Sequence, residues 1–267
     1  MSTYFQDKVI WITGASSGIG EALTYELARE SPYLVLSSRR AAELERVARQ
    51  SGLSPDRLFI LPLDLTDYEE MPGLVGRVLD RFGRIDILIN NGGISQRSSV
   101  MDTDVAVARR IMDVNFTGTA ALTKAVVPYM IEARSGQIIS VASVAGVVAT
   151  PKRSSYAAAK GALIRFMEAL RAELHEYGIH VGVILPGYVR TQISVNALLG
   201  DGSPQGSMDS RTEQGISPEA CAEKMVHAIR KQEDQTYIAG TLEMLGVYLQ
   251  RFFPALLRIM VRKVKAS

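Results

Sequence analysis

The stretch VIWITGASSGIG, residues 9–20, joins an apolar run to a glycine-rich segment, and a helical pattern follows through Arg29. Glycine permits positive φ and removes the Cβ atoms that would keep a ligand away from a tight turn. A helix that starts directly after such a turn presents free N–H groups and a partial positive charge, which suit a pyrophosphate. The segment predicts a dinucleotide site. Its expected contacts are Gly14, Ser16, Ser17, Gly18, Ile19 and Gly20.

Beyond this turn, short β-branched runs alternate with longer helical patterns. The runs are nearly continuous in apolar residues, as expected for parallel strands that are covered on both faces. This alternation predicts an α/β fold: a single-domain, Rossmann-type, doubly wound parallel β-sheet of about seven strands with helices on both faces. The predicted strands are Lys8–Thr13, Leu34–Ser38, Leu58–Leu63, Ile85–Asn90, Gln137–Val141, His180–Leu185 and Thr236–Ile238.

The chain divides into a catalytic part and an extension. We expect residues 1–240 to form the dinucleotide-binding catalytic domain, with a substrate loop at 192–217 that is rich in Gly, Ser and Gln. We expect residues 241–267 to form an amphipathic, basic helical extension that Pro254 breaks in two. Thr66 and Glu69 match a capping box, and Ser217 is a cap residue before Pro218.

Composition narrows the function class. Of 267 residues, 47% are hydrophobic, which is enough for a full core and excludes a disordered chain. The single cysteine, Cys221, cannot form an internal disulfide, so we expect a cytoplasmic protein; neither a signal peptide nor a spanning helix is predicted. The net charge is +2, yet residues 251–267 alone carry +5, which leaves −3 on the rest. A nucleic-acid partner is therefore not expected, and neither is a metal site.

The same turn matches a second motif. Gly14-Ala15-Ser16-Ser17-Gly18 fits the G-x-S-x-G turn that carries the nucleophile of serine hydrolases. Such an enzyme also needs a suitably placed histidine, and the chain offers only His175, His180 and His227. We expect these within a helix, at the start of a buried strand and on another helix. A serine hydrolase that uses Ser16 remains a minor alternative.

A tyrosine and a lysine lie one helical turn apart. Tyr156 and Lys160 have the spacing i, i+4, which places them on the same face of a predicted helix. A phenol ionises near pH 10. A neighbouring ammonium group favours the phenolate, so we expect Lys160 to lower the pKa of Tyr156 and make it a usable general acid/base.

Further polar motifs follow successive strands, at the edge where a doubly wound sheet binds its ligands. Asn90-Asn91-Gly92-Gly93 ends the fourth strand, Ser143 follows the fifth, and Pro186-Gly187-Tyr188-Val189-Arg190-Thr191 follows the sixth. With these motifs, residues 6–240 resemble the short-chain dehydrogenase/reductase family: TGxxxGxG, NNGG, an Asn in the fifth helix (Asn115), Ser, YxxxK and PGxVxT occur in family order. One departure is Gly92, where the family usually has alanine.

The resemblance implies a role for each matching residue. Tyr156 would exchange the hydroxyl proton, Ser143 would hydrogen-bond the reacting oxygen, and Lys160 would bind the nicotinamide ribose. Asn115 would hold a water that links Lys160 to solvent, which completes the expected catalytic set. The other expected cofactor contacts are Asp64 at the adenine, Thr191 at the carboxamide, and Leu65, Asn91, Gly92, Pro186, Gly187 and Val189 along the cleft. Taken singly, Asn115 could merely bend its helix and Asp64 could merely be a cap.

The end of the second strand predicts which nicotinamide cofactor is used. A site that prefers NAD usually has an acidic residue there to accept from the ribose 2′-hydroxyl. This chain reads Ser37-Ser38-Arg39-Arg40, and a guanidinium suits a phosphate dianion. Arg39, with help from Ser38 and Arg40, therefore predicts NADP(H). The alternative is a pair of solvated arginines that open a helix.

The substrate is predicted only as a class. The chemistry is hydride transfer between the cofactor and a carbonyl or secondary alcohol, and Ile193, Val195, Leu198 and Leu199 indicate a small apolar substrate unless they pack onto the core. A redox-inactive nicotinamide-binding regulator on the same fold is the alternative function. The basic amphipathic C-terminal helices predict packing on their own domain or on a second copy, with peripheral membrane contact as the alternative. The family resemblance implies a homodimer or homotetramer.

Overall fold

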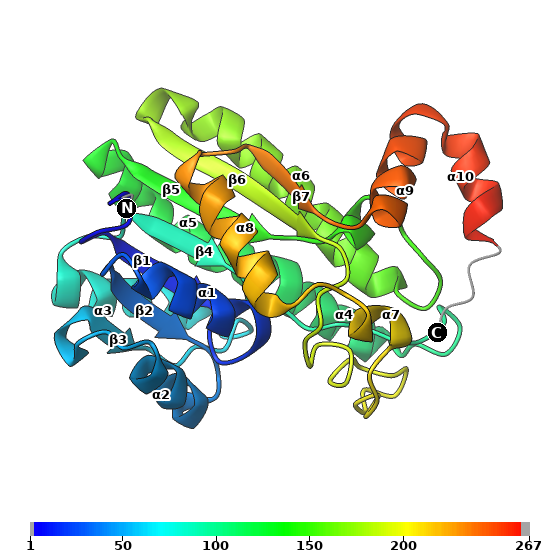
Figure 1. Cartoon of the computed structure of the whole chain (residues 1–267), viewed down its shortest axis with the longest axis horizontal. Helices are drawn as coiled ribbons and strands as arrows, with labels where there is room; N and C mark the ends of the chain where they lie inside the picture. Colours follow the sequence, from blue (N-terminus) through cyan, green and yellow to red (C-terminus); the bar gives the residue numbers. More distant parts are fainter. Residues whose placement is uncertain (1–2, 263–267) are drawn as a thin grey trace.

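Seven short apolar segments form one parallel sheet in the computed structural model, which describes residues 3–262. The strand order is β3-β2-β1-β4-β5-β6-β7, so the chain reverses its direction of winding between β1 and β4. The fold class predicted from the sequence, a single-domain doubly wound Rossmann-type sheet, is confirmed (Figure 1). The strands are β1 (Val9–Thr13), β2 (Tyr33–Ser37), β3 (Leu58–Ile60), β4 (Ile87–Asn90), β5 (Gly136–Val141), β6 (Ile179–Pro186) and β7 (Gln235–Ile238).

Helices cover both faces of the sheet because side chains alternate along each strand. In β1, Ile10 and Ile12 pack in the core beneath α1, α2 and α8, whereas Val9 and Trp11 pack in the core beneath α3, α5 and α6. The helices are α1 (Gly18–Ala28), α2 (Ala41–Gln50), α3 (Met71–Phe82), α4 (Val105–Met112), α5 (Gly118–Ala133), α6 (Ser154–Leu174), α7 (Ser210–Glu213), α8 (Pro218–Arg230), α9 (Thr241–Phe252) and α10 (Pro254–Val261).

Of the two predicted helix caps, one is observed and one is wrong. Ser217 caps α8, where its hydroxyl accepts a hydrogen bond from the Ala220 N–H at 3.1 Å. The Thr66–Glu69 capping box does not form. Asp64 accepts from both the Thr66 N–H (3.0 Å) and its hydroxyl (2.8 Å), so the local turn captures the hydroxyl before a helix begins.

The C-terminal segment forms two helices that meet at Pro254, as its pattern predicts. Proline tolerates the first turn of α10 but cannot continue α9, and Phe253 between them has non-helical φ and ψ. The pair stands away from the sheet at the right of Figure 1. Lys263, Val264 and Lys265 of the predicted extension lie outside the described residues. Within residues 3–262, no helix is both long enough and apolar enough to span a bilayer.

Candidate active site

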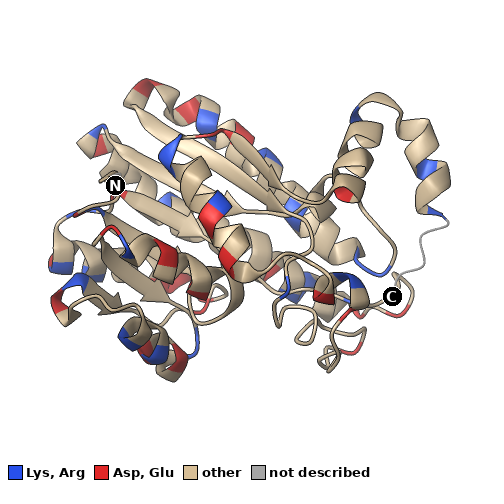
Figure 2. Ribbon diagram, in the orientation of Figure 1, with Lys and Arg blue, Asp and Glu red and all other residues tan. Residues whose placement is uncertain are grey.

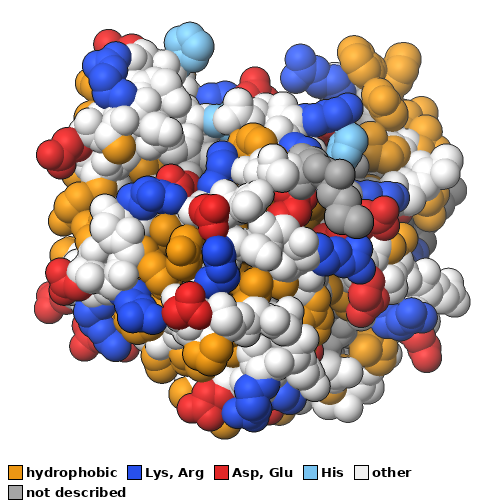
Figure 3. Space-filling model, turned by 60° about the vertical axis from the view of Figure 1, so that its left-hand side comes forward, with side chains coloured by type: hydrophobic (Ala, Val, Ile, Leu, Met, Phe, Trp, Pro, Cys, Tyr) orange, Lys and Arg blue, Asp and Glu red, His pale blue; other side chains and the backbone are white. Residues whose placement is uncertain are grey.

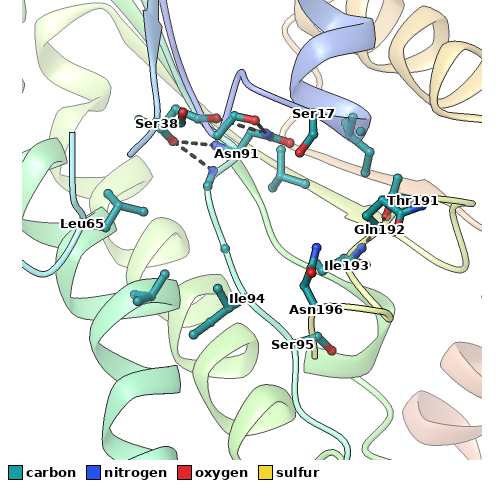
Figure 4. A pocket seen from close by; sticks show the side chains of 18 of the residues that line it. Ser17, Ser38, Leu65, Asn91, Ile94, Ser95, Thr191, Gln192, Ile193 and Asn196 are labelled. Carbon is teal, nitrogen blue, oxygen red and sulfur yellow. Dashed lines mark hydrogen bonds between the residues drawn. The ribbon is translucent and has the colours of Figure 1, made fainter. Parts of the chain in front are cut away.

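A cavity of about 500 Å³ opens at the carboxyl ends of the strands, beside the point where the strand order reverses. This is where ligands enter doubly wound sheets. Figure 4 shows Ser17, Ser38 and Asn91 at one end of this cavity, and Ser95 and Asn196 at the other. All but two of the predicted site residues line it. The exceptions are Gly20 and Asn115.

The glycine-rich turn forms one end of the cavity. Gly14 (φ 67°) and Gly18 (φ 58°) have left-handed backbone conformations that favour glycine. No side chain caps the start of α1, and Ser17, Gly18 and Ile19 line the cavity there. The free N–H groups of this first turn are therefore available to an anionic ligand.

Gly20 has a packing role instead of a lining role. A Cβ atom at this position would lie 2.2 Å from the Gly14 carbonyl oxygen and 2.6 Å from the Asn91 amide nitrogen. Asn91 uses that nitrogen to donate to the carbonyls of Thr13 (3.0 Å) and Gly14 (3.3 Å). Gly20 thus lets α1 approach the turn closely, while Asn91 ties the end of β4 to the end of β1.

Gly92, which departs from the family's usual alanine, lies at a crowded position. A Cβ atom there would lie 2.9 Å from a terminal methyl carbon of Leu65 and 3.3 Å from the Thr13 hydroxyl. An alanine would require the flexible end of Leu65 to move. In this chain glycine leaves that space to the Leu65 side chain.

Three basic or hydroxyl side chains at the end of β2 lie beside the glycine-rich turn. Ser38, Arg39 and Arg40 all line the cavity. The Arg40 guanidinium donates to the hydroxyls of Ser16 (3.0 Å) and Ser17 (2.9 Å). These bonds hold a positive charge next to the N-terminus of α1, and nothing acidic from β2 opposes it.

Asp64 lies at the same end. Burial alone would raise the pKa of its carboxyl group, but the two hydrogen bonds from Thr66 and the charges of Arg39 and Arg110 hold that pKa below its ordinary value. Asp64 therefore forms a turn and part of the cavity wall, but it is not a helix cap, because the following 3-10 turn has Asp67 at its cap position.

Tyr156 and Ser143 lie together deeper in the cavity. Tyr156 is on the first turns of α6 and is buried, and Ser143 follows β5. Burial raises the pKa of Tyr156, while Arg153, a hydrogen bond with Ser143, and Arg97 act in the opposite direction. The Ser143 hydroxyl is held by the Ala145 N–H, from which it accepts at 3.1 Å.

Lys160 is buried one turn further along α6. Its Nζ donates to the Val141 carbonyl at 2.8 Å, and desolvation lowers its pKa to about 8. The predicted effect of Lys160 on the pKa of Tyr156 stays a prediction. The groups that favour the phenolate are Arg153, Ser143 and Arg97.

Asn115 is fully buried in a π-helical turn, Asp113–Thr117, between α4 and α5. Its amide nitrogen donates to the carbonyls of Ile94 (2.9 Å) and Ile111 (3.0 Å), and its oxygen accepts from the Ile94 N–H at 3.0 Å. A Cβ atom on Gly93 would lie 2.5 Å from that oxygen and 3.4 Å from Lys160 Nζ. Asn115 thus shapes its helix, and its oxygen lies on the same side of Gly93 as the lysine.

The sequence did not reveal Gln96, which organises the start of α6. Gln96 is fully buried, and its side-chain oxygen accepts from the backbone N–H of Ser155 (2.9 Å) and of Tyr156 (3.4 Å). Its amide nitrogen donates to Thr103 at 2.8 Å. A glutamine that caps a helix 59 positions away has no local sequence signal, so only the structure could identify it.

The sequence also does not reveal a buried ion pair, because its two residues are 112 positions apart. Arg97 donates to Asp209, with side chains only 6% and 4% exposed, and Arg153 lies 3.6 Å from the same carboxylate. Burial would raise the pKa of Asp209, but hydrogen bonds from Arg97 and Gln205 keep it low. Arg153 also lies over the Tyr188 ring, 5.4 Å from its centroid. The cluster joins the segment after β4, the start of α6 and the predicted substrate loop.

The predicted substrate loop, residues 192–217, is anchored to the segment that follows β4. The Leu198 N–H donates to the Ser95 carbonyl and the Arg97 N–H donates to the Leu198 carbonyl, both at 2.9 Å. The sequence predicts that four apolar residues of this loop face the substrate. Two of them, Ile193 and Leu198, line the cavity, whereas Val195 and Leu199 do not. The loop also contains the short helix α7.

The histidines do not support a hydrolase. None of the three lines the cavity. His180 lies near the start of β6, opposite Gln137 of the neighbouring strand β5. Pro186, at the other end of β6, lines the cavity. They are six residue steps apart along the strand, roughly 20 Å. Ser16 moreover accepts from Arg40 and has no base beside it.

Comparisons with known proteins agree with this geometry. The family described as short chain dehydrogenase matches residues 8–200. A Drosophila melanogaster protein, "Dehydrogenase/reductase SDR family protein 7-like", is 42% identical over 253 residues, which are 93% of this chain and 78% of the relative.

Two solved structures are similar throughout. A short-chain dehydrogenase from Streptomyces avermitilis is 26% identical, with a TM-score of 0.81 over 97% of this chain and 99% of that one. A 3-ketoacyl-(acyl-carrier-protein) reductase from Brucella melitensis, solved with NADH, is 25% identical, with a TM-score of 0.76 over 89% and 98%. Motifs, fold and relatives agree, and the chain belongs to the short-chain dehydrogenase/reductase family.

Proposed function

We propose that this oxidoreductase uses NADP(H) and transfers a hydride between the nicotinamide and the carbonyl or secondary alcohol carbon of a small apolar substrate. The observation that carries the proposal is the convergence of Tyr156, Ser143 and Lys160 on one cavity, whose other end holds the uncapped N-terminus of α1. An anion site and a proton donor in one cavity fit a phosphate-bearing redox cofactor and its substrate.

The residues present fit a dinucleotide along the whole cavity. The first turn of α1 would hold the pyrophosphate, Asp64 and Leu65 would flank the adenine, and the Pro186–Thr191 segment would border the carboxamide. The Lys160 ammonium group has three N–H donors. One of them bonds to the Val141 carbonyl, and the other two can bond to the ribose hydroxyls. The bound cofactor supplies or accepts the hydride.

Tyr156 is proposed to hold the proton of the reaction. Because burial raises its pKa, the neutral phenol is the resting form near pH 7 and can donate to a carbonyl oxygen that gains negative charge. Ser143 is placed to orient the same oxygen, since its hydroxyl is already held next to Tyr156. Arg153 and Arg97 favour the phenolate that remains after the proton leaves.

The preference for NADP(H) rests on the end of β2. A 2′-phosphate on the adenine ribose would meet Ser38, Arg39 and Arg40, and Arg40 is already directed to the glycine-rich turn by Ser16 and Ser17. Guanidinium groups bind phosphate through charge-assisted hydrogen bonds. The NADH in the Brucella reductase supports the nicotinamide class for this chain, while the phosphate preference depends on these three residues.

The substrate end of the cavity supports an apolar carbonyl or alcohol. Ile94, Ile193 and Leu198 provide an apolar wall, and Ser95 and Asn196 add a few polar groups (Figure 4). Pockets of this kind bind small molecules by apolar contact and use the polar groups for orientation. The homodimer or homotetramer and the cytoplasmic location stay predictions, which sedimentation analysis and cell fractionation can check.

Two measurements on the purified protein test the proposal. Thermal unfolding is followed with NADPH, with NADH and without nucleotide, and NADPH oxidation is then followed with a panel of ketones and aldehydes. We expect NADPH to stabilise the protein more than NADH does, and at least one apolar carbonyl to be reduced. Stabilisation without turnover across a wide panel would assign the redox-inactive regulator instead. Esterase activity that is lost in Ser16→Ala would assign the hydrolase.

A further inference from the structure

The C-terminal helices expose a concentration of apolar side chains. Within residues 3–262, thirteen large apolar residues are exposed, and eight of them lie between Leu242 and Met260. Phe252 and Phe253, at the junction of α9 and α10, are 65% and 63% exposed. Figure 3 shows hydrophobic side chains gathered at the upper right, beside basic ones. Soluble monomers rarely expose a large contiguous apolar patch, so this face indicates an interaction surface.

The charges on these helices are of one sign apart from a single residue. Between Thr241 and Arg262 the acidic residue is Glu243, and the basic residues are Arg251, Arg258 and Arg262 (Figure 2). Glu243 faces the body of the protein, where its carboxylate accepts from the Tyr188 N–H at 3.0 Å. The outward charge of both helices is therefore positive. Apolar side chains interleaved with arginines are the composition of helices that lie in the surface of an anionic bilayer.

The same charges disfavour a second copy as the occupant. A two-fold contact places one patch against the same patch of the other molecule. It would bring the three positive charges of Arg251, Arg258 and Arg262 close to three identical ones, and like-charge contacts are costly. An anionic lipid surface matches both the apolar and the basic character.

The helices are also joined to the active site. Glu243, on the first turn of α9, bonds to Tyr188, and Gly187 beside it lines the cavity. A Cβ atom on Gly187 would lie 2.4 Å from the Glu243 carboxylate oxygen, so helix and cavity wall are in close contact. Whatever α9 and α10 bind will therefore lie next to the carboxyl edge of the sheet.

We propose that the α9–α10 pair docks this protein on an anionic membrane surface, with Phe252 and Phe253 inserted among the acyl chains and Arg251, Arg258 and Arg262 against the headgroups. The inference does not depend on which cofactor or substrate the cavity takes. It concerns residues outside that cavity and is tested without measuring turnover.

Vesicle flotation tests the docking directly. Monodisperse full-length protein is mixed with vesicles of phosphatidylcholine alone or with roughly a third phosphatidylserine, a composition that gives a negative surface potential. We expect the protein to float with the anionic vesicles and to float less at high salt, because ions screen the attraction. Phe252→Ser/Phe253→Ser should weaken the partition coefficient about tenfold or more through lost apolar burial. Arg258→Glu should weaken it about 30-fold on anionic vesicles, since two units of charge change, and little on neutral ones.

Two control variants make the same kinds of substitution elsewhere on the surface. Tyr129→Ser removes a ring that is 44% exposed on α5, and Arg49→Glu reverses a charge that is 72% exposed on α2. Both should float like the native protein, and all variants should keep the native melting temperature. The proposal is overturned if the native protein binds neither vesicle, or if the α9–α10 variants float as well as the controls. It is also overturned if sedimentation shows a dimer that Phe252→Ser/Phe253→Ser abolishes while vesicles are not bound.

Discussion

The two ends of the active-site cavity are built in different ways. At the cofactor end, glycines allow backbone to approach backbone, and short side chains such as Asn91 and Ser16 bond to groups in neighbouring turns. At the substrate end, long side chains reach across the fold: Arg97 pairs with Asp209, 112 positions away, and Glu243 holds the N–H of Tyr188. The first kind of construction joins recognisable motifs at the ends of neighbouring strands, even where the motifs are 78 positions apart in the chain, as Asn91 and Thr13 are. The second depends on tertiary packing.

Substitutions at the two ends of the cavity should therefore have different effects. A change at the cofactor end should alter nucleotide affinity or the chemical step and leave the rest of the chain intact. A change in the buried charges at the substrate end should alter stability and substrate binding together, because these charges connect the loop to α6.

The largest expected effect is on the chemical step. Tyr156→Phe keeps the ring but removes the proton donor, so turnover should fall by about 10²–10⁴-fold, the usual contribution of general acid/base catalysis. The dissociation constant for NADPH, measured by fluorescence titration, should change less than threefold, roughly. Turnover that stays native would remove Tyr156 from the mechanism.

The next effect tests the substrate end. Arg97→Met leaves the buried Asp209 with the more distant Arg153 as its remaining cationic partner and Gln205 as a neutral donor, so the free energy of unfolding should fall by about 3 kcal/mol. Arg97→Met/Asp209→Leu removes both charges and should be more stable than the single variant. Urea denaturation measures both. If the single variant is as stable as the native protein, the ion pair does not hold the loop.

The third effect concerns the buried lysine. In the folded protein the pKa of Lys160 is about 8, below its ordinary value, so the unfolded chain binds an extra proton between pH 8 and about 10.5. Its burial therefore destabilises the fold fully below pH 8, and this penalty is relieved as pH rises. Between pH 7 and 10, the native protein should gain about 2 kcal/mol in free energy of unfolding relative to Lys160→Met. Urea curves at several pH values measure this, and parallel pH dependences would contradict it.

The smallest effect tests the choice of cofactor. Arg39→Ala should weaken NADPH binding by about one to two powers of ten and leave NADH almost unchanged, because only NADPH has a phosphate at that position. Ser38→Asp should go further by repelling the phosphate and accepting from a free 2′-hydroxyl, which moves preference towards NADH. Titration of each variant with NADPH and with NADH measures the dissociation constants that test this preference. Equal native affinities, or equal losses in Arg39→Ala, would exclude the NADP(H) preference.

The same contrast explains what could be predicted from the sequence. Every predicted strand end lies within three residues of the observed one, and several agree without a difference, because apolar runs such as VIWIT and ILIN are covered on both faces and have few alternative positions. The residues of the cavity could be listed because their motifs follow the ends of parallel strands, which meet at one edge.

Other features of the site could not be predicted, because they depend on contacts that no local sequence pattern indicates. Gln96 caps α6 from 59 positions away, and its neighbours in sequence do not indicate this. The spacing of Tyr156 and Lys160 predicts that they share a helix face, but it does not reveal that Lys160 is buried and bonded to the Val141 carbonyl, with its pKa lowered to about 8. The Thr66 capping box failed because Asp64, two residues earlier, competes for the same hydroxyl.

The most direct test of the proposed function is transfer of the hydride itself. The native protein is incubated with NADPH that carries deuterium at both C4 positions of the nicotinamide, together with an apolar ketone that it reduces, and the alcohol is examined by mass spectrometry. We predict one deuterium on the carbinol carbon of the product, formed about 10²–10⁴-fold more slowly by Tyr156→Phe. Absence of deuterium in the alcohol, or equal labelling by Tyr156→Phe at the native rate, would contradict it.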